Sequence, residues 1–162
     1  MTTSRTAQSV NDRSPPISIF LSGEAFLNAA RHTHRAYSDR SLKLRFEMPI
    51  FYLYSHAIEL TMKAFLRARG VSAVKLKDPK RFGHSLQNLW NECLAHELVV
   101  DPAPQVVIEG VVSLLEPYAT SYEFRYIRTG LKEFPSLEDV RLAAEKLAAA
   151  IRPVCDATVR RK

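Results

Sequence analysis

The chain has 162 residues, of which 46% are apolar and 25% charged, and it carries a net charge of +6. This length suits one domain with its own core, and the apolar content excludes global disorder. No apolar run reaches the roughly 18 residues of a membrane span, and the polar N-terminus lacks the apolar core of a signal peptide. We therefore expect a cytoplasmic protein with no membrane association.

The first half of the chain predicts a tail and two helices. Residues 1–16 are polar and typical of a mobile tail. Apolar side chains at helical spacing predict a helix over residues 22–38, and His34 falls on its apolar face, where a core residue is expected rather than a ligand. Residues 46 or 49 to 68 predict a second helix that is apolar on most of its circumference, which is typical of the central helix of a bundle.

The second half predicts a basic loop, three helices and one extended segment. The loop covers residues 70–83. The third helix opens at Gly83-His84-Ser85-Leu86 and ends near residue 98, with Trp90 on its apolar face, and the fourth covers residues 105–119. Alternating aromatic residues predict an extended segment over 122–130, and the last helix begins near Ser136 and is bent or shortened by Pro153.

Only five glycines are present, and Ala, Leu, Glu and Lys recur, so the composition also favours helices. The predicted fold is an all-α, up-and-down bundle of four to five helices. It forms a single domain over residues 17–158 and is followed by a basic C-terminal end, residues 159–162.

The predicted central helix carries a polar stripe. His56, Glu59 and Lys63 are three and four residues apart, so their side chains share one face. Charge on a buried helix costs free energy unless it is paired or used. Either Glu59 and Lys63 form an ion pair, or they line a pocket in which Glu59 accepts a hydrogen bond and Lys63 contacts a phosphate.

Charge is segregated along the sequence. Between Lys63 and Arg81 there are seven basic residues and one acidic residue, whereas between Glu92 and Glu123 there are six acidic residues and no Lys or Arg. The basic segment predicts either phosphate contacts or a solvated surface that pairs with the acidic segment of another copy. In the first case the phosphate-contacting residues are Lys75, Lys77, Lys80 and Arg81.

His84 stands where the third helix begins, and the positive end of a helix dipole attracts anions. A phosphate could bind there, or His84 could bond Glu59 across the bundle; the sequence leaves both open. Arg125 could clamp a carboxylate or phosphate with two bonds, and Tyr126 could stack on a base. The predicted ligand-binding set is therefore Glu59, Lys63, His84, Arg125 and Tyr126.

No metal site or cofactor is expected. Cys93 and Cys155 lie in predicted helices and are expected to be reduced thiols. The two histidines of His32-x-His34 point to different faces of a helix, so they do not form a metal-binding pair.

Three segments, in this order, resemble one known family: residues 56–66, with Glu59 and Lys63; the Gly83-His84-Ser85-Leu86 segment; and Phe124-Arg125-Tyr126. Over roughly residues 20–152 the chain resembles the HEPN superfamily, the "higher eukaryotes and prokaryotes nucleotide-binding" helical domains. The resemblance implies a helical bundle that commonly dimerises. It also implies a place in a bacterial-type toxin–antitoxin, abortive-infection or other defence system directed at nucleic acids.

Many members of that family are metal-independent ribonucleases with an Arg, then four to six residues, then a His. None of the five histidines of this chain follows an Arg at that spacing, so the usual proton carrier is missing. We therefore expect a non-catalytic homodimeric module that binds a nucleotide, RNA or a partner protein. The alternatives are a divergent ribonuclease that uses His84 or His56 with Arg125, and a purely structural dimerisation protein.

Overall fold

The computed structural model of the protein describes residues 14–121, 123–124 and 132–160. All the regular secondary structure of these residues is helical, as the sequence predicts. The helices are α2 (Pro16–Ser38), α3 (Met48–Ala68), α4 (Ala73–Lys77), α5 (Leu86–Ala95), α6 (Pro102–Thr120) and α7 (Leu137–Arg160).

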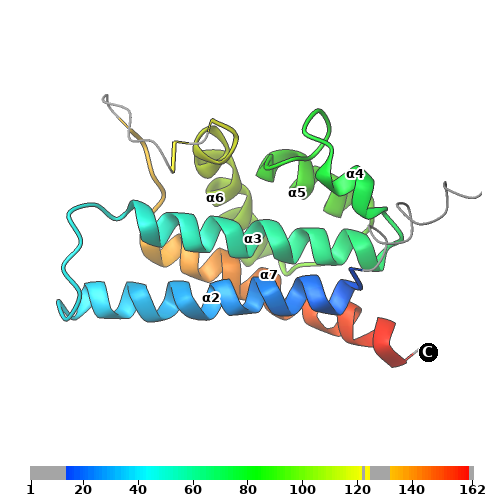
Figure 1. Ribbon diagram of the computed structural model, residues 1–162, viewed down its shortest axis with the longest axis horizontal. Helices are drawn as coiled ribbons and strands as arrows, with labels where there is room; N and C mark the ends of the chain where they lie inside the picture. Colours follow the sequence, from blue (N-terminus) through cyan, green and yellow to red (C-terminus); the bar gives the residue numbers. More distant parts are fainter. Residues whose placement is uncertain (1–13, 122, 125–131, 161–162) are drawn as a thin grey trace, which may run out of the picture.

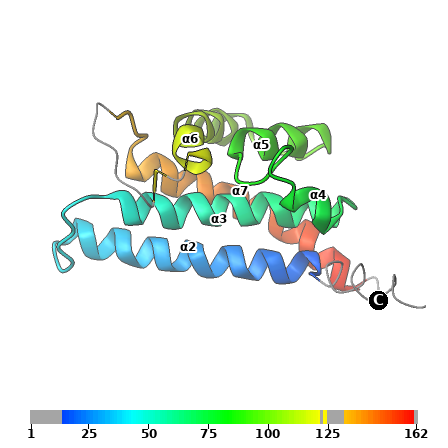
Figure 2. The same cartoon turned by 45° about the horizontal axis from the view of Figure 1, so that its top comes forward.

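Helices α2, α3 and α7 form the long layer of the molecule. α2 and α3 run antiparallel side by side, and α7 packs against both (Figure 1). On the other side of α3 the shorter helices α4, α5 and α6 form a second layer (Figure 2). Because α3 contacts α2, α7 and α5, it lies at the centre of the bundle, as its nearly all-round apolar sequence predicts.

The core fills the space between these layers. Trp90 of α5 is 1% exposed and belongs to the core, as predicted. His34 of α2 is buried, as predicted, and its Nδ1 lies 3.1 Å from the hydroxyl of Tyr54. Cys93 and Cys155 are buried free thiols.

One glycine sets the distance between α2 and α3. A methyl group on Gly23 would lie 3.1 Å from Thr61 Oγ1 and 3.2 Å from Leu60 Cβ, which is closer than ordinary van der Waals contact. The absence of a side chain at Gly23 therefore lets the two helices approach and brings the middle of α3 into the core.

Several predicted boundaries were wrong. The described residues contain six helices rather than four to five, because the predicted loop 70–83 holds α4, whose N-cap Ser72 accepts a hydrogen bond from Lys75 N. α2 begins at Pro16 rather than at residue 22, since a proline with its fixed φ suits a first helical position. α7 is not shortened at Pro153 but continues to Arg160. There the burial of Ile151 and Cys155 outweighs the loss of one backbone hydrogen bond.

Other predictions fall largely outside the described residues. They are the tail, apart from residues 14–16, the extended segment at 122 and 125–130, and the last two residues of the basic C-terminal end. Among the helices that are described, none combines the length and the apolar character needed to cross a membrane.

Candidate functional site

The candidate site is built around Glu59, a buried carboxylate on α3. The residue is only 5% exposed, and its carboxylate contacts His84 of the turn before α5. Lys63, one turn later on the same helix, donates from Nζ to Glu59 Oε1 at 2.5 Å. The i, i+4 spacing of the two residues places this ion pair along the helix, as one of the two predictions for the polar stripe requires.

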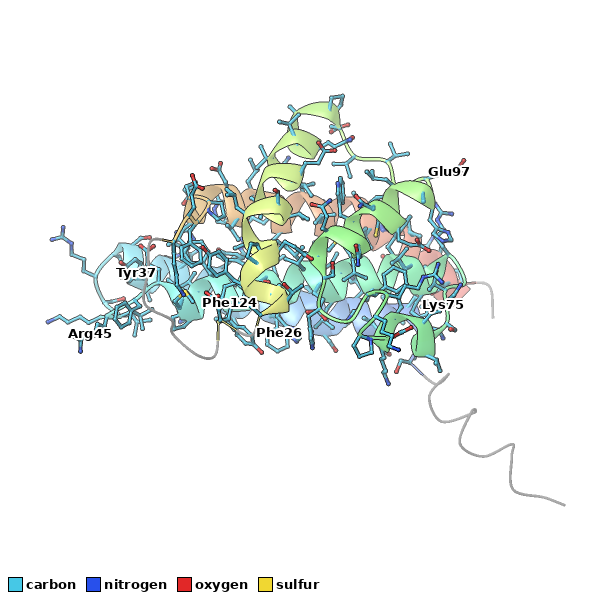
Figure 3. All side chains as sticks on the ribbon, turned by 90° about the horizontal axis from the view of Figure 1, so that it is seen from above. Phe26, Tyr37, Arg45, Lys75, Glu97 and Phe124 are labelled. Carbon is cyan, nitrogen blue, oxygen red and sulfur yellow. The ribbon has the colours of Figure 1, made fainter. Side chains whose placement is uncertain are left out.

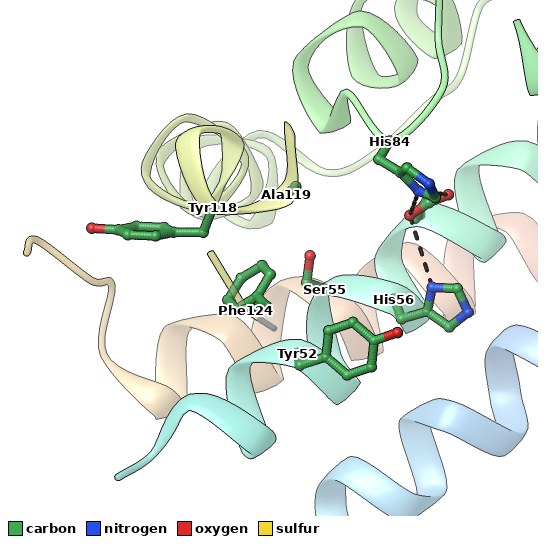
Figure 4. A pocket seen from close by; sticks show the side chains of 8 residues that line it. Tyr52, Ser55, His56, His84, Tyr118, Ala119 and Phe124 are labelled. Carbon is green, nitrogen blue, oxygen red and sulfur yellow. Dashed lines mark hydrogen bonds and ion pairs between the residues drawn. The ribbon is translucent and has the colours of Figure 1, made fainter. Parts of the chain in front are cut away.

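Two histidines complete the surroundings of the carboxylate. His84 Nδ1 lies 3.2 Å from both oxygens of Glu59, and His56 Nδ1 lies 3.8 Å from Oε2 (Figure 4). An ionised carboxylate can only accept hydrogen bonds, so the proton of the His84 contact must sit on Nδ1. When His84 is neutral, its Nε2 therefore carries a lone pair.

Glu59 stays ionised despite its burial. Burial by itself raises the pKa of Glu59, but His56, Lys63 and His84 lower it by a larger amount, to about 2. Glu59 is therefore an anion at neutral pH. It holds cationic and imidazole groups in place, and it has no proton to donate as a general acid.

The loop that carries His84 is attached to α3 by a further bond. Lys63 Nζ also donates to the carbonyl oxygen of Gly83 at 2.8 Å. Gly83 has φ +45°, and a methyl group there would lie 3.1 Å from Pro79 Cα, so a glycine suits this tight turn. Lys63 thus joins Glu59 to the backbone beside His84.

A small hollow of about 40 Å³ opens beside this cluster. Its polar wall consists of Ser55, His56, Glu59 and His84, and its aromatic wall consists of Tyr52, Tyr118 and Phe124 (Figure 4). The rings of Tyr52 and Tyr118 lie 6.1 Å and 5.9 Å from that of Phe124, within the range of aromatic contacts. We call this hollow the aromatic pocket.

A second hollow, of about 370 Å³, adjoins the first and is more basic. It is lined by Lys63, Lys77, His84 and residues of the turn before α5, and we call it the basic pocket. His84, whose side chain is 47% exposed, lines both hollows. A ligand that contacts His84 can therefore extend into an aromatic and a cationic environment at once.

The N-terminus of α5 is already occupied by a carboxylate, so it is not the open anion site that the sequence allowed. Glu116 of α6 accepts from Ser85 Oγ at 2.6 Å and from Gln87 N at 2.9 Å. The protein therefore supplies its own carboxylate at this helix N-terminus. A phosphate that contacts His84 has to approach from the side of the basic pocket.

The predicted site residues are distributed as follows. Glu59, Lys63, His84 and His56 come together in one cluster. Lys77 lines the basic pocket, and Lys75, Lys80 and Arg81 are exposed on α4 and the following turn. Arg125 and Tyr126 lie outside the described residues.

Sequence reasoning missed four residues, Tyr52, Ser55, Tyr118 and Glu116. Tyr52 and Ser55 precede the polar stripe by a turn or less, so their helical spacing could have placed them beside it. Tyr118 and Glu116 belong to α6, and no pattern in the sequence indicates that α6 packs beside His84. The described residues contain no group of three His, Cys, Asp or Glu side chains placed to hold a metal ion.

Comparisons with known proteins add no assignment to this geometry. The chain matches no protein-family model, and no curated protein or solved structure shows significant similarity to it.

Proposed function

We propose that the protein is a HEPN-like module that binds the phosphate and base of a nucleotide or of a short single-stranded RNA without cleaving it. The observation that carries the proposal is the position of His84 between the aromatic pocket and the basic pocket. The aromatic pocket is too small to enclose a base, but a base can stack on the partly exposed rings of Tyr52 and Phe124 that line it, while its phosphate contacts the cations of the basic pocket.

The bonds of Lys63 and Glu59 support binding rather than catalysis. Lys63 is shared between Glu59 and the Gly83 carbonyl, and Glu59 is an anion that cannot donate a proton. Both residues therefore serve to position the loop of His84. Because Lys63 is engaged in this way, the phosphate contacts are expected from the exposed lysines, above all Lys77 and Lys80.

The test compares two double variants by fluorescence anisotropy with a labelled uridine decamer. Lys77→Ala with Lys80→Ala should weaken binding roughly tenfold, which corresponds to about 1.4 kcal/mol. Lys43→Ala with Arg45→Ala is the matched control, because both residues are exposed in the loop that joins α2 to α3. Figure 3 shows Arg45 of that loop at the opposite end of the molecule from Lys75. Equal losses for the two double variants would mean unspecific attraction and would refute the proposal.

One observation also favours a second candidate, a metal-independent ribonuclease. The Glu59 carboxylate fixes the Nδ1 proton of His84, which leaves Nε2 as a base, and His56 lies beside the same carboxylate. Incubation of the purified protein with total RNA tests this candidate. Cleavage that His84→Ala abolishes and His96→Ala leaves intact would establish the enzyme and would disprove binding without cleavage.

A further inference from the structure

A separate cleft lies between α2 and α7, and none of its lining residues belongs to the aromatic or the basic pocket. Its volume is about 290 Å³, which is room for roughly ten water molecules at about 30 Å³ each. Three arginines, two glutamates and the buried His34 line it: Arg31, Arg35, Arg141, Glu138, Glu145 and His34. With His34 neutral, these side chains sum to a charge of +1.

The buried Tyr54 fixes the tautomer of His34. Tyr54 is completely buried, and its burial raises the pKa of the phenol to about 12, so the O–H keeps its proton. Among the described residues the hydroxyl has one hydrogen-bond partner, His34 Nδ1 at 3.1 Å. A buried O–H without an acceptor is costly, so Tyr54 donates to Nδ1 and the proton of neutral His34 sits on Nε2.

The Nε2–H of His34 is therefore a donor that faces the cleft. Its nearest charged neighbour is Glu138 Oε1 at 3.8 Å, which is beyond hydrogen-bond distance. The side chain of His34 is 92% buried by its neighbours, whereas that of Glu138 is 67% exposed and can turn outward. The cleft thus holds a fixed donor behind a movable carboxylate.

The guanidinium groups extend this donor surface. Arg141 donates from Nε and Nη2 to Glu138 and from Nη1 to Glu145, and Arg31 pairs with Glu145. Arg35 lines the cleft and has no carboxylate within ion-pair distance among the described residues, although its charge helps to lower the pKa of Asp39, one turn later. One cation is therefore left over, and a second becomes available if Glu138 turns away.

From this arrangement we propose that the cleft between α2 and α7 binds a phosphate group, which displaces the Glu138 carboxylate and accepts hydrogen bonds from His34 Nε2, Arg35 and Arg141. In the protein alone, Glu138 occupies the place of the ligand. A tetrahedral phosphate presents oxygens in several directions and can meet donors from both helices at once, whereas a carboxylate offers two oxygens in one plane.

The test is an NMR titration of the full chain with inorganic phosphate at constant ionic strength, observed at the His34 ring nitrogens and the arginine Nε signals. The signals should shift to saturation. Arg35→Ala should weaken binding at least about tenfold, and Glu138→Gln should tighten it about fivefold, because it removes a competing negative charge. Arg35 and Glu138 are both exposed. Misfolding cannot weaken phosphate binding in one of these variants and tighten it in the other.

Two further arms make the result decisive. Lys146→Ala, an exposed α7 residue that does not line the cleft, should bind phosphate as the unaltered chain does. Acetate should bind more weakly than phosphate. Shifts that never saturate, an Arg35→Ala variant with unchanged affinity, or acetate that binds as tightly as phosphate would each overturn the proposal.

Discussion

At the scale of single residues, the free energy of the site depends on Glu59. A carboxylate that is 5% exposed has lost most of its hydration, and such a loss is compensated only by close, well-aligned partners. Lys63 and His84 lie at 2.5 Å and 3.2 Å from it. Each partner compensates part of this cost. Removing Lys63 or His84 therefore raises the free energy of burying the Glu59 carboxylate.

The pH dependence of stability should report this carboxylate directly. The pKa of Glu59 falls from an ordinary 4.5 to about 2 on folding, so the unfolded chain binds the proton more tightly than the folded one. The stabilisation is complete above about pH 4.5 and is lost as the pH falls toward 2, by about 3 kcal/mol in total. Urea unfolding of the unaltered chain and of Glu59→Gln between pH 2 and 7 measures it, and the gap between the two should close on acidification.

A matched variant separates this effect from the general acid sensitivity of the chain. Glu109→Gln changes an exposed carboxylate on α6 whose recorded hydrogen-bond partner is Gln105. It should alter the free energy of unfolding by less than about 0.5 kcal/mol at every pH. A constant difference between the unaltered chain and Glu59→Gln over the whole range would show that Glu59 titrates normally.

How much of the site the sequence reveals depends on the separation of the residues along the chain. The cluster of His56, Glu59 and Lys63 follows from helical spacing alone, since all three belong to α3. The contact of His84 with Glu59 spans 25 residues, and helical spacing could not decide between it and a bound phosphate. Glu116 was not predicted, because its role depends on the packing of α6 against α5, which no local pattern encodes.

At the scale of elements, the separation of α2 and α3 is set where Gly23 meets Thr61. Helical periodicity predicts both helices, but it does not show which face of α2 must come close to α3. The existence of the long helices and the start of α5 at Gly83-His84-Ser85-Leu86 were therefore predictable. The short helix α4 and the start of α2 were not, because capping by Ser72 and a proline at the first helical position decide them.

Two glycine substitutions should change stability in opposite directions. Alanine is the better helix former at both positions. Gly23→Ala should nevertheless destabilise the protein by about 1–2 kcal/mol, because its methyl group meets Thr61 and Leu60. Gly110→Ala in α6 has no atom within 4 Å of the new methyl group and should stabilise by about 0.5–1 kcal/mol.

Chemical denaturation of the two variants measures both effects on one scale. The Gly110→Ala variant controls for helix propensity, so the difference between the two values isolates the contact of α2 with α3. If Gly23→Ala were as stable as Gly110→Ala, the two helices would have room to separate, and α2 would not hold the middle of α3 in place.

At the scale of the whole molecule, segregation of charge along the sequence does not by itself separate basic from acidic residues in space. Figure 3 shows Lys75 and Glu97 toward the same end, while Arg45 lies at the other. The loop between α2 and α3 adds Arg40, Lys43 and Arg45 to the basic surface. The net charge of +6 therefore attracts polyanions from several directions, and attraction alone does not identify a binding site.

The dependence of RNA affinity on salt, measured for three forms of the protein, separates a specific site from this general attraction. For a single strand the slope of log K against log salt is about 0.7 per phosphate contact. The double change of Lys77 and Lys80 to alanine should lower the magnitude of the slope by about 1.4, because it removes two such contacts. Phe124→Ala should weaken binding by about 1–3 kcal/mol and leave the slope unchanged, since base stacking releases no counterions.

The two variants therefore test different parts of the proposed ligand contact. Phe124 supplies an aromatic ring to the aromatic pocket, whereas Lys77 lines the basic pocket, and His84 connects the two. If affinity does not depend on salt, the phosphate contacts do not exist. If Phe124→Ala binds as tightly as the unaltered chain while the lysine variants lose affinity, the protein holds the RNA backbone without a base, and the aromatic pocket has another role.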